Sequence, residues 1–523
     1  MFLLNIIVFV LVLGVIILIH ELGHFYFAKK AGILCHEFAI GMGPAIYQKR
    51  KGETIYSIRS IPIGGYVSMA GESISDALIK KEQVIGVKLN SQGQVQYIIM
   101  NSELSSDYVG IVKSFDLYGK DFNPLYIELD IQGELKRFSV VRDARYQFSK
   151  EKEMWITPQE KSFESKTLWQ RFLVIFAGPL MNFILALFLF LIVGFFAVKP
   201  NLASNALGGV VSGSTADIVG LEVGDEITAI NGTPIHAWTD VSSVMSNLDS
   251  VYVSLSYRRD GQTYQVNDVT VSVVIQMAGI TNITEDRTLY NDTPTIGQTF
   301  GRAKSDGGLE PGDIITSIEN DFGTVTPIQD WDQLISYFKL NTSGTIIVRY
   351  DRNGNAGTAT YDLISANALQ KLGYQPIVFQ LGIQATADFD LGYTLLYPFR
   401  AFYSNMMQVF NTIGLLFNPS ENLGIGDLSG PVGIFSLVSS TTSQGLVALI
   451  GFTAFLSINI GLLNLLPIPA LDGGRLVFLG IEAITRKPLN RRLENTINNV
   501  MFFILLGLFV FVTYNDILRL IRG

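Results

Sequence analysis

Five residues near the N-terminus combine the side chains that a metal-dependent hydrolase needs. The segment from His20 to His24 reads HELGH and matches the HExxH pattern. On a helix, positions i and i+4 share one face, so both imidazoles can reach one zinc ion. Glu21 lies beside them and can take a proton from water that the zinc activates. Only 4 histidines occur in 523 residues, which makes chance a poor explanation.

A catalytic zinc ion uses three protein ligands and keeps one position open for water. No third histidine follows at the spacing of soluble metzincins, and His36 falls in a predicted loop or strand, which is more typical of a surface histidine. The better candidate is Asp472, at the end of a charge-free stretch and just after two prolines that break a helix. Backbone groups freed at that depth are tolerated only where they line a cavity. An interfacial carboxylate beside Arg475 is the alternative.

Four apolar segments are predicted to cross a membrane. The first contains 18 uncharged residues from Phe2 to Ile19, enough for roughly 27 Å of helix. No basic residue precedes this run and no small-residue cleavage site ends it, which favours a retained helix over a signal peptide. The predicted transmembrane helices occupy residues 1–30, 170–198, 442–474 and 497–516.

A fifth apolar segment covers residues 391–417, but Arg400, Asn405 and Asn411 interrupt it and Pro398 lies near its start. These polar side chains favour an interfacial amphipathic helix in the region 390–430. A fifth membrane span is the alternative, and it would reverse the direction of every later span.

Lysines and arginines next to the membrane predict the orientation, because cytoplasmic loops carry an excess of them. They follow the first span (Lys29, Lys30, Lys49, Arg50, Lys51), precede the second (Lys161, Lys166, Arg171) and separate the third from the fourth (Arg475, Arg486, Lys487, Arg491, Arg492). The N-terminus and residues 199–390 are therefore expected outside. With four spans, the first and third run in the same direction, which brings His20, His24 and Asp472 to the same level.

The composition supports a membrane protein and excludes other classes. Apolar residues make up 48% of the chain and charged residues only 16%, because lipid-facing surface cannot carry charge. A net charge of −8, spread along the chain, argues against nucleic acid as a partner. The only cysteine, Cys35, excludes an intrachain disulfide.

Two regions between the spans are expected to be rich in β-structure. Residues 35–160 alternate apolar and polar positions between Gly and Asp turns, which predicts short strands and hairpins. Residues 205–275 and 290–385 form an internal repeat: GLEVGDEITAIN from Gly220 matches GLEPGDIITSIE from Gly308. The second copy carries extra residues in one turn. Two copies of one small domain are therefore predicted.

Together these motifs resemble the site-2 protease family of intramembrane zinc metalloproteases. The closest branch is the bacterial regulator-of-sigma-E protease type with tandem PDZ domains. The resemblance is carried by HELGH, by LDG at 471–473, by the paired repeats and by four further segments: FAIGMGP at 38–44, IPIGGYV at 61–67, GPLMN at 178–182 and LSGPVG at 428–433. They cover about two-thirds of the chain. Two features depart from the family: the stretch 77–161 is longer, and Gly307-Gly308 replaces the usual Ala-Gly.

The resemblance implies a role for each site residue. His20, His24 and Asp472 would bind zinc, and Glu21 would act as general base. Asn464 would hold the substrate or the oxyanion, and Asn182 would contact substrate backbone. The 38–67 hairpin, like the membrane-reentrant β-loop of the family, could offer a strand edge to an unwound substrate. Substrate binding is assigned to Gly64, Gly65, Pro467 and Pro469.

The expected fold is a polytopic α-helical membrane protein with about four transmembrane helices, a membrane-associated β-hairpin region and two extracytoplasmic PDZ-like α+β domains. The expected function is hydrolysis of peptide bonds inside single-pass transmembrane proteins in the bilayer of a bacterial plasma membrane. The substrates would be anti-sigma factors or signal-peptide remnants that another protease has already cut. The alternatives are a catalytically silent scaffold that binds protein tails, and a metal transporter. An intact HELGH argues against the scaffold, and a single acidic partner argues against the transporter.

Overall fold

The computed structural model describes residues 2–71, 78–120, 123–150, 152–290, 293–418, 421, 423–487 and 489–522. The chain divides into two compact units. The first contains the chain up to Leu189 together with Val438–Gly507, and the second contains Phe190–Leu437 together with the chain from Leu508 onward.

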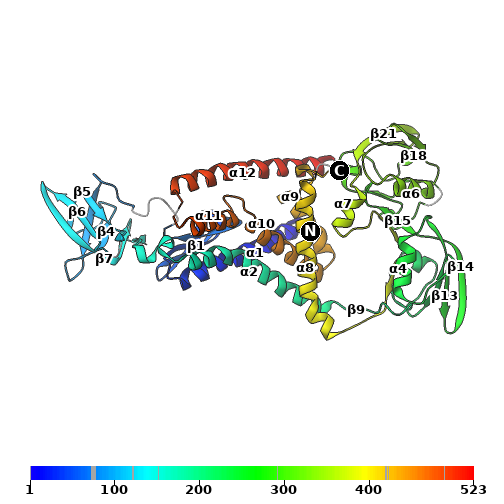
Figure 1. Cartoon of the computed structure of the whole chain (residues 1–523), viewed down its shortest axis with the longest axis horizontal. Coiled ribbons are helices and arrows are strands. Elements are labelled where there is room, and N and C mark those ends of the chain that lie inside the picture. Colours follow the sequence, from blue (N-terminus) through cyan, green and yellow to red (C-terminus); the bar gives the residue numbers. More distant parts are fainter. Residues whose placement is uncertain are drawn as a thin grey trace. The chain divides into compact units, whose positions relative to one another are not determined.

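Four described helices are long and apolar enough to cross a membrane: α1 (Phe2–Lys30), α2 (Leu168–Phe196), α10 (Leu446–Leu465) and α12 (Arg491–Arg522) (Figure 1). They lie where the four spans were predicted. The last helix is longer than the predicted range 497–516, because its two ends continue into polar turns that hydropathy does not detect.

Helix α1 buries a single stripe of residues. The stripe consists of Val12, Ile16, His20, His24 and Ala28, each four positions after the last, together with Gly23 beside His24. Elsewhere on this helix, apolar side chains such as Ile7, Leu11 and Val15 are exposed, as expected for contact with lipid. Both histidines of the HELGH motif therefore point to the interior of the unit.

The predicted third span, 442–474, is not one continuous helix. Helix α10 ends at Leu465, and a separate helix α11 (Asp472–Thr485) begins at Asp472. Prolines at 467 and 469 lack a donor N–H and push the preceding residues into extended conformations, which stops the helix. Asp472 therefore starts a helix instead of ending one.

A long hairpin follows α1. Its strands β1 (Cys35–Lys51) and β2 (Thr54–Met69) have 17 and 16 residues, longer than the short strands predicted. Both strands bend back along their length: Phe38 pairs with Tyr56 on one side and with Val67 on the other, so the pair forms a small sheet of short segments. The turn at Gly52 has φ of +63°, a conformation that glycine adopts without strain.

Residues 78–160 form a β-barrel without an α-helix among the described residues, as the sequence indicated. Its strands are β3 (Val84–Leu89), β4 (Val95–Ile99), β5 (Tyr108–Asp116), β6 (Tyr126–Ile131), β7 (Glu134–Gln147) and β8 (Glu153–Trp155), drawn in blue and cyan in Figure 1. The sheet order is β4-β3-β5-β6-β7-β8, and an additional parallel pairing of β4 with β7 closes it. Val87, Ile98 and Ile127 fill the interior.

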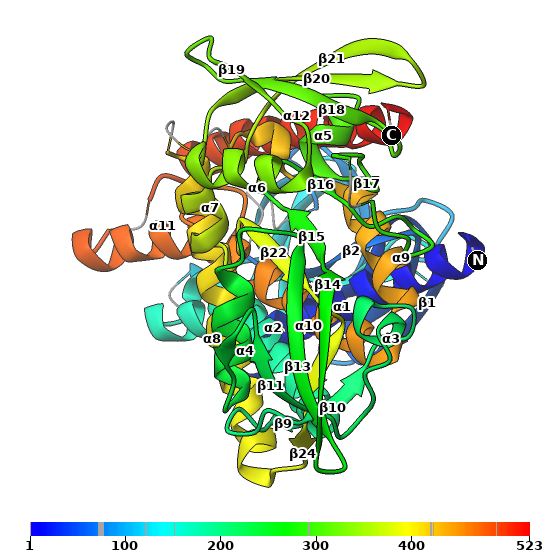
Figure 2. The same ribbon diagram turned by 90° about the vertical axis from the view of Figure 1, so that its right-hand side faces the viewer.

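The second unit contains the repeat. Strands β11 (Glu226–Ile230), β12 (Thr233–Pro234), β13 (Tyr252–Arg259) and β14 (Gln262–Thr270) form one sheet; β18 (Ile314–Glu319), β19 (Val325–Pro327), β20 (Thr345–Arg352) and β21 (Asn355–Asp362) form the other. Both sheets have the same strand order, β12-β11-β13-β14 and β19-β18-β20-β21; Figure 2 shows β13 and β14 of the first sheet and β18 to β21 of the second. An ion pair between a buried aspartate and a half-buried arginine also recurs: Arg259 Nε lies 2.7 Å from Asp225 Oδ1, and Arg352 Nε lies 2.6 Å from Asp313 Oδ1.

Helices accompany the strands of each copy. They are α3 (Thr215–Ile218) and α4 (Trp238–Ser246) in the first copy, and α5 (Gly301–Ser305), α6 (Trp331–Leu340) and α7 (Ala366–Lys371) in the second. Asp225 and Asp313 lie in the matching GD dipeptides of the two repeats, so the shared ion pair explains why this part of the sequence recurs.

The two copies exchange strands, which changes the predicted boundaries 205–275 and 290–385. Strand β22 (Ile377–Gln380) pairs with β15 (Ser272–Ile275), and β23 (Ile383–Ala385) pairs with β10 (Leu207–Val210). Residues 377–385 therefore complete the first copy. Strands β16 (Ile280–Thr281) and β17 (Gln298–Thr299) extend the sheet of β15 and β22. One continuous hydrophobic core includes both copies, which is why they fold together.

The repeat region begins and ends at one place. Strand β9 (Lys199–Pro200) follows α2 and pairs with β24 (Ala387–Asp388), which precedes α8 (Leu391–Leu416). Helix α8 matches the predicted amphipathic helix in the region 390–430, and it is not one of the four described helices suited to cross a membrane. A short helix α9 (Pro431–Ser443), not predicted, lies within the charge-free stretch ahead of α10.

Candidate metal centre and active site

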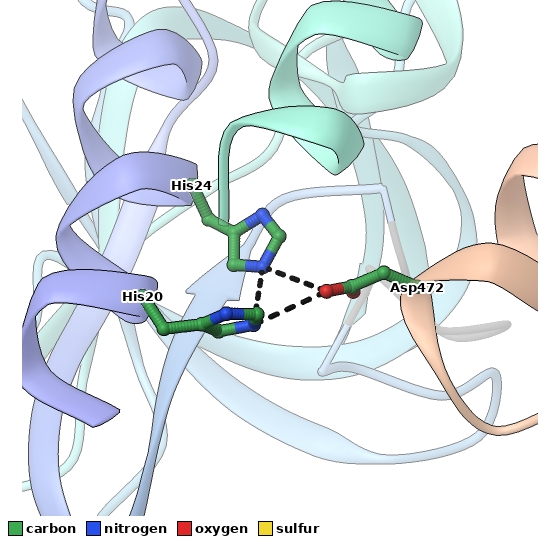
Figure 3. A group of neighbouring side chains, drawn as sticks. All are labelled: His20, His24 and Asp472. Atoms are coloured by element: carbon green, nitrogen blue, oxygen red, sulfur yellow. Dashed lines mark hydrogen bonds and ion pairs between the residues drawn. The ribbon is translucent and has the colours of Figure 1, made fainter. Parts of the chain in front are cut away.

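Three potential ligands from distant parts of the chain lie together. His20 and His24 project from one face of α1, and Asp472 projects from the first turn of α11 toward them (Figure 3). Asp472 Oδ2 lies 3.1 Å from His20 Nε2 and 3.3 Å from His24 Nε2. The two Nε2 atoms are 3.2 Å apart. All three ligand atoms lie within 4.8 Å of one another.

The surroundings fit a metal ion. Two imidazole nitrogens and one carboxylate oxygen are the donor set of a catalytic zinc site with an open position. Among the described residues, Asp472 Oδ2 is buried and has no hydrogen-bond partner despite the nearby rings, which leaves a lone pair for a cation. Gly178 keeps the space open, since a Cβ there would lie 2.2 Å from His24 Nε2.

Helix α2 orients the His24 ring. His24 Nδ1 lies 2.8 Å from the carbonyl oxygen of Val174. A carbonyl can only accept, so Nδ1 carries the proton and Nε2 keeps its lone pair for a metal ion. Close packing makes this contact reachable: a Cβ on Gly23 would lie 2.3 Å from the Ala177 carbonyl oxygen, so only glycine lets α1 approach α2 so closely.

A loop between α10 and α11 positions Asp472. The glycines after Asp472 have no space for a side chain, since a Cβ on Gly473 would lie 2.0 Å from the Leu466 carbonyl oxygen and a Cβ on Gly474 2.5 Å from that of Ile468. The loop thus folds back over the first turn of α11. Asn498 in α12 accepts a hydrogen bond of 3.0 Å from the Ala470 N–H. An ion pair ties α11 to α2: Arg171 Nη2 lies 2.5 Å from Glu482 Oε1.

The three residues border a cavity of about 330 Å³. Glu21, Asn464 and Gly65 are among its lining residues, as a site for water, base and substrate requires. Strand β2 passes close to the base, because a Cβ on Gly65 would lie 3.1 Å from Glu21 Cγ. The cavity therefore contains a carboxylate next to the ligands and an extended strand beside it.

Other predicted site residues lie elsewhere. Gly64, Pro467 and Pro469 are not among the described lining residues; a Cβ on Gly64 would instead lie 2.4 Å from Met42 Cε within the hairpin. Asn182 is fully buried, with Nδ2 3.2 Å from His20 Nδ1, so its side chain contacts a candidate ligand instead of the cavity. His36 lies in β1, 3.4 Å from Thr157 Oγ1 and outside the ligand group, as expected for a non-ligand.

A half-buried carboxylate supports the strand beside the cavity. Glu37 in β1 accepts hydrogen bonds from the Ser57 hydroxyl (2.5 Å), from Arg59 Nη2 (2.6 Å) and from the Tyr66 hydroxyl (2.7 Å). Burial would raise the pKa of Glu37, but these hydrogen bonds outweigh it and lower that pKa. Burial, with the Glu37 carboxylate next, raises the pKa of Tyr66 to about 12. A charged Glu37 and a neutral Tyr66 thus hold β2 in place.

Sequence reasoning missed three contributors. Arg475 and Tyr66 line the cavity, and the Val174 carbonyl holds His24. Tyr66 lies inside the IPIGGYV motif, and Arg475 lies one helical turn after Asp472, so both could have been found from spacing. A backbone carbonyl carries no signal in the sequence.

The helices and this donor set define a metal-dependent hydrolase of the membrane. The model of peptidase family M50 matches residues 8–508. The chain belongs to this family, the site-2 protease family, and the resemblance predicted from its motifs is confirmed. It is a metalloprotease and a membrane protein.

Relatives match over almost their whole length. The Regulator of sigma-W protease RasP of Bacillus subtilis is 32% identical, with 99% of this chain and 100% of the relative covered. Zinc metalloprotease RasP of Bacillus licheniformis is 32% identical over 99% of both chains. Zinc metalloprotease RasP of Shouchella clausii is 30% identical over 98% of both.

Proposed function

We propose that this chain is a zinc endopeptidase that hydrolyses peptide bonds within transmembrane segments of other membrane proteins. The observation that carries the proposal is the convergence of His20, His24 and Asp472 within 4.8 Å of one another. These residues would be the zinc ligands. Zinc is favoured over harder cations because two of the three donors are imidazoles, and the relatives named zinc metalloproteases agree.

Glu21 is the general base of this proposal. A bound zinc ion would supply Lewis-acid polarisation and lower the pKa of water. Glu21 takes a proton from the attacking water as the new C–O bond forms at the scissile carbonyl. It then passes this proton to the departing amine as the C–N bond breaks, so that a carboxylic acid and an amine result. Its position beside the ligands, in the same cavity, supports this role.

Asn464 and strand β2 would hold the substrate. Asn464 lines the cavity and carries an amide donor suited to a developing oxyanion. From Gly65 to Ser68, β2 pairs with β1 on one side only among the described residues, so the other edge of this part can add an extended peptide next to Gly64 and Gly65. Pro467 and Pro469 would act indirectly, by shaping the loop that ends in Asp472.

The repeat region would act as two PDZ-like domains outside the cytoplasm and favour substrates already trimmed by another protease. The chain would then reside in a bacterial plasma membrane. A relative named as a regulator of sigma-W makes anti-sigma factors the first substrates to test. Signal-peptide remnants are the second class.

The catalytic proposal is tested by Glu21→Gln in the purified full chain with a model transmembrane substrate. We expect zinc to stay bound and cleavage to fall by at least about a thousandfold, since the base is lost and the ligands remain. His20→Ala should lose both zinc and cleavage, and the exposed His236→Ala is the matched control that should lose neither. Cleavage unaffected by Glu21→Gln would favour a scaffold or a transporter.

The proposal that the repeat region acts as a filter, admitting only trimmed substrates, is tested by deleting residues 201–386 and joining the ends with a short turn. Strands β9 and β24 pair directly, so the cut ends already lie next to each other and the deletion removes the shared core as a whole. We expect the shortened protein to cleave untrimmed substrates that the full chain refuses. Continued refusal would contradict the filter and leave the catalytic proposal intact.

A further inference from the structure

Asn182 lies behind the metal site, where a substrate does not reach. Its side chain is fully buried in α2. Helix α10 closes over it: the Ser457 hydroxyl donates a 2.8 Å hydrogen bond to the Asn182 carbonyl oxygen, and a Cβ on Gly461 would lie 3.2 Å from Asn182 Cβ. A role in contacting substrate backbone does not fit this burial.

The Asn182 amide instead faces the far side of a candidate ligand, with Nδ2 3.2 Å from His20 Nδ1. A metal ion at Nε2 needs the lone pair there, so a neutral His20 must carry its proton on Nδ1 and donate it to an acceptor. His24 has such an acceptor in the Val174 carbonyl. For His20, the amide oxygen of Asn182 is the acceptor within reach.

A second observation points the same way. With Nδ2 toward His20, Asn182 Oδ1 is buried without a hydrogen-bond partner in the described part of the chain. A buried acceptor left unpaired is destabilising, because it has lost its hydrogen bonds to water and gained none in return. Turning the planar amide by about half a turn places Oδ1 against His20 Nδ1–H and gives this oxygen a donor.

We propose that Asn182 is a positioning residue that selects the metal-binding tautomer of His20. Its amide oxygen accepts the Nδ1 proton, and its neutral side chain avoids the cost of a buried charge behind the site. The stripe of α2 that contains Arg171, Val174, Gly178 and Asn182 thereby serves all three candidate ligands. The inference rests on the proposed metal site and assigns Asn182 to the metal, not to the substrate.

The test compares two substitutions of nearly equal shape. Asn182→Leu removes the acceptor, and Asn182→Asp keeps it. Zinc affinity of the purified, zinc-depleted full chain is measured by competition with a chromophoric chelator. We expect the Leu variant to bind zinc about 10–100-fold more weakly and the Asp variant to stay within about threefold of the parent or bind more tightly. Ser457→Ala, which alters only the backbone contact of Asn182, should leave the affinity unchanged.

The outcomes separate this inference from the proposed function. A parent chain that binds no zinc overturns both. A parent that binds zinc, with the Leu variant folded and equally tight, overturns only the role of Asn182. Equal losses in the folded Leu and Asp variants would also overturn it, since they would reflect packing. If the buried charge prevents folding of the Asp variant, Asn182→Thr replaces it, and zinc binding no tighter than in the Leu variant counts against the proposal.

Discussion

The two regions that carry the candidate ligands are built in opposite ways. His20 and His24 lie on a regular helix without proline, and their spacing alone places both on one face. Asp472 follows an irregular loop with two prolines, and four separate contacts hold that loop and the helix after it. The histidine pair is thus locally determined, whereas the position of the carboxylate depends on neighbours far along the chain. Damage to the distant supports of Asp472 should therefore weaken the site while leaving the HELGH helix intact.

The largest effect on zinc binding and cleavage is expected beside the histidine pair, at Gly178. Gly178→Ala would place a methyl group 2.2 Å from His24 Nε2 and 2.9 Å from His20 Cε1. We expect zinc binding to be lost and cleavage to fall by about a thousandfold, equivalent to ~4 kcal/mol. Zinc content and cleavage of the purified protein measure this. Gly14→Ala in α1 is the control, since nothing lies within 4 Å of the added methyl, and zinc retained in Gly178→Ala would show that the metal lies elsewhere.

The second largest effect on the rate of cleavage is expected from a change in the loop that holds Asp472. Gly473→Ala would push a methyl group to within 2.0 Å of the Leu466 carbonyl oxygen and force the loop away from α11. A displacement of about 1 Å in a catalytic group can cost on the order of a hundredfold in rate, and we expect a loss of that size. In Gly480→Ala, in the same helix, the added methyl group meets nothing within 4 Å, so the rate of cleavage should not change. Similar activity of the two variants would mean that the loop tolerates movement.

A smaller effect is expected from the ion pair at the other end of α11. Arg171 and Glu482 form two hydrogen bonds, of 3.0 and 2.5 Å, between helices α2 and α11. Glu482→Gln should lower cleavage about tenfold, because α11 loses its anchor while the ligands stay in place. The reversed pair, Arg171→Glu with Glu482→Arg, should recover part of the loss. A double variant worse than either single change would argue against an anchoring pair.

The smallest effect concerns Asn498. Its side chain accepts one hydrogen bond from the Ala470 N–H, which is worth about 1 kcal/mol. Asn498→Ala should therefore weaken zinc binding by about threefold to tenfold, with α1 unaffected. Chelator competition reports the affinity, and Asn495→Ala on the same helix is the comparison. An affinity equal to that of the parent would show that the two prolines and two glycines hold the loop without help.

Much of the fold could be predicted because membranes and repeats leave strong patterns. Apolar runs placed the four candidate spans, and the repeated GD dipeptide marked two related sheets whose Arg–Asp ion pairs also recur. The break between Leu465 and Asp472 was misplaced, since hydropathy continues across it while the prolines interrupt the backbone. The exchange of β22 and β23 was not foreseeable, because the paired residues lie more than a hundred positions apart in the chain.

By itself, the sequence determined the local chemistry of this protein: two imidazoles one helical turn apart, a carboxylate beside them, and helices suited to lipid. Only the tertiary structure decided what surrounds each ligand, including the Val174 carbonyl behind His24, the Asn182 amide behind His20 and the close approach of Gly178 to both rings. The physical reason is the separation, along the sequence, of the groups that interact. Helical spacing acts over four residues, whereas the contacts that orient a ligand join side chains and backbone groups 150 or more positions apart.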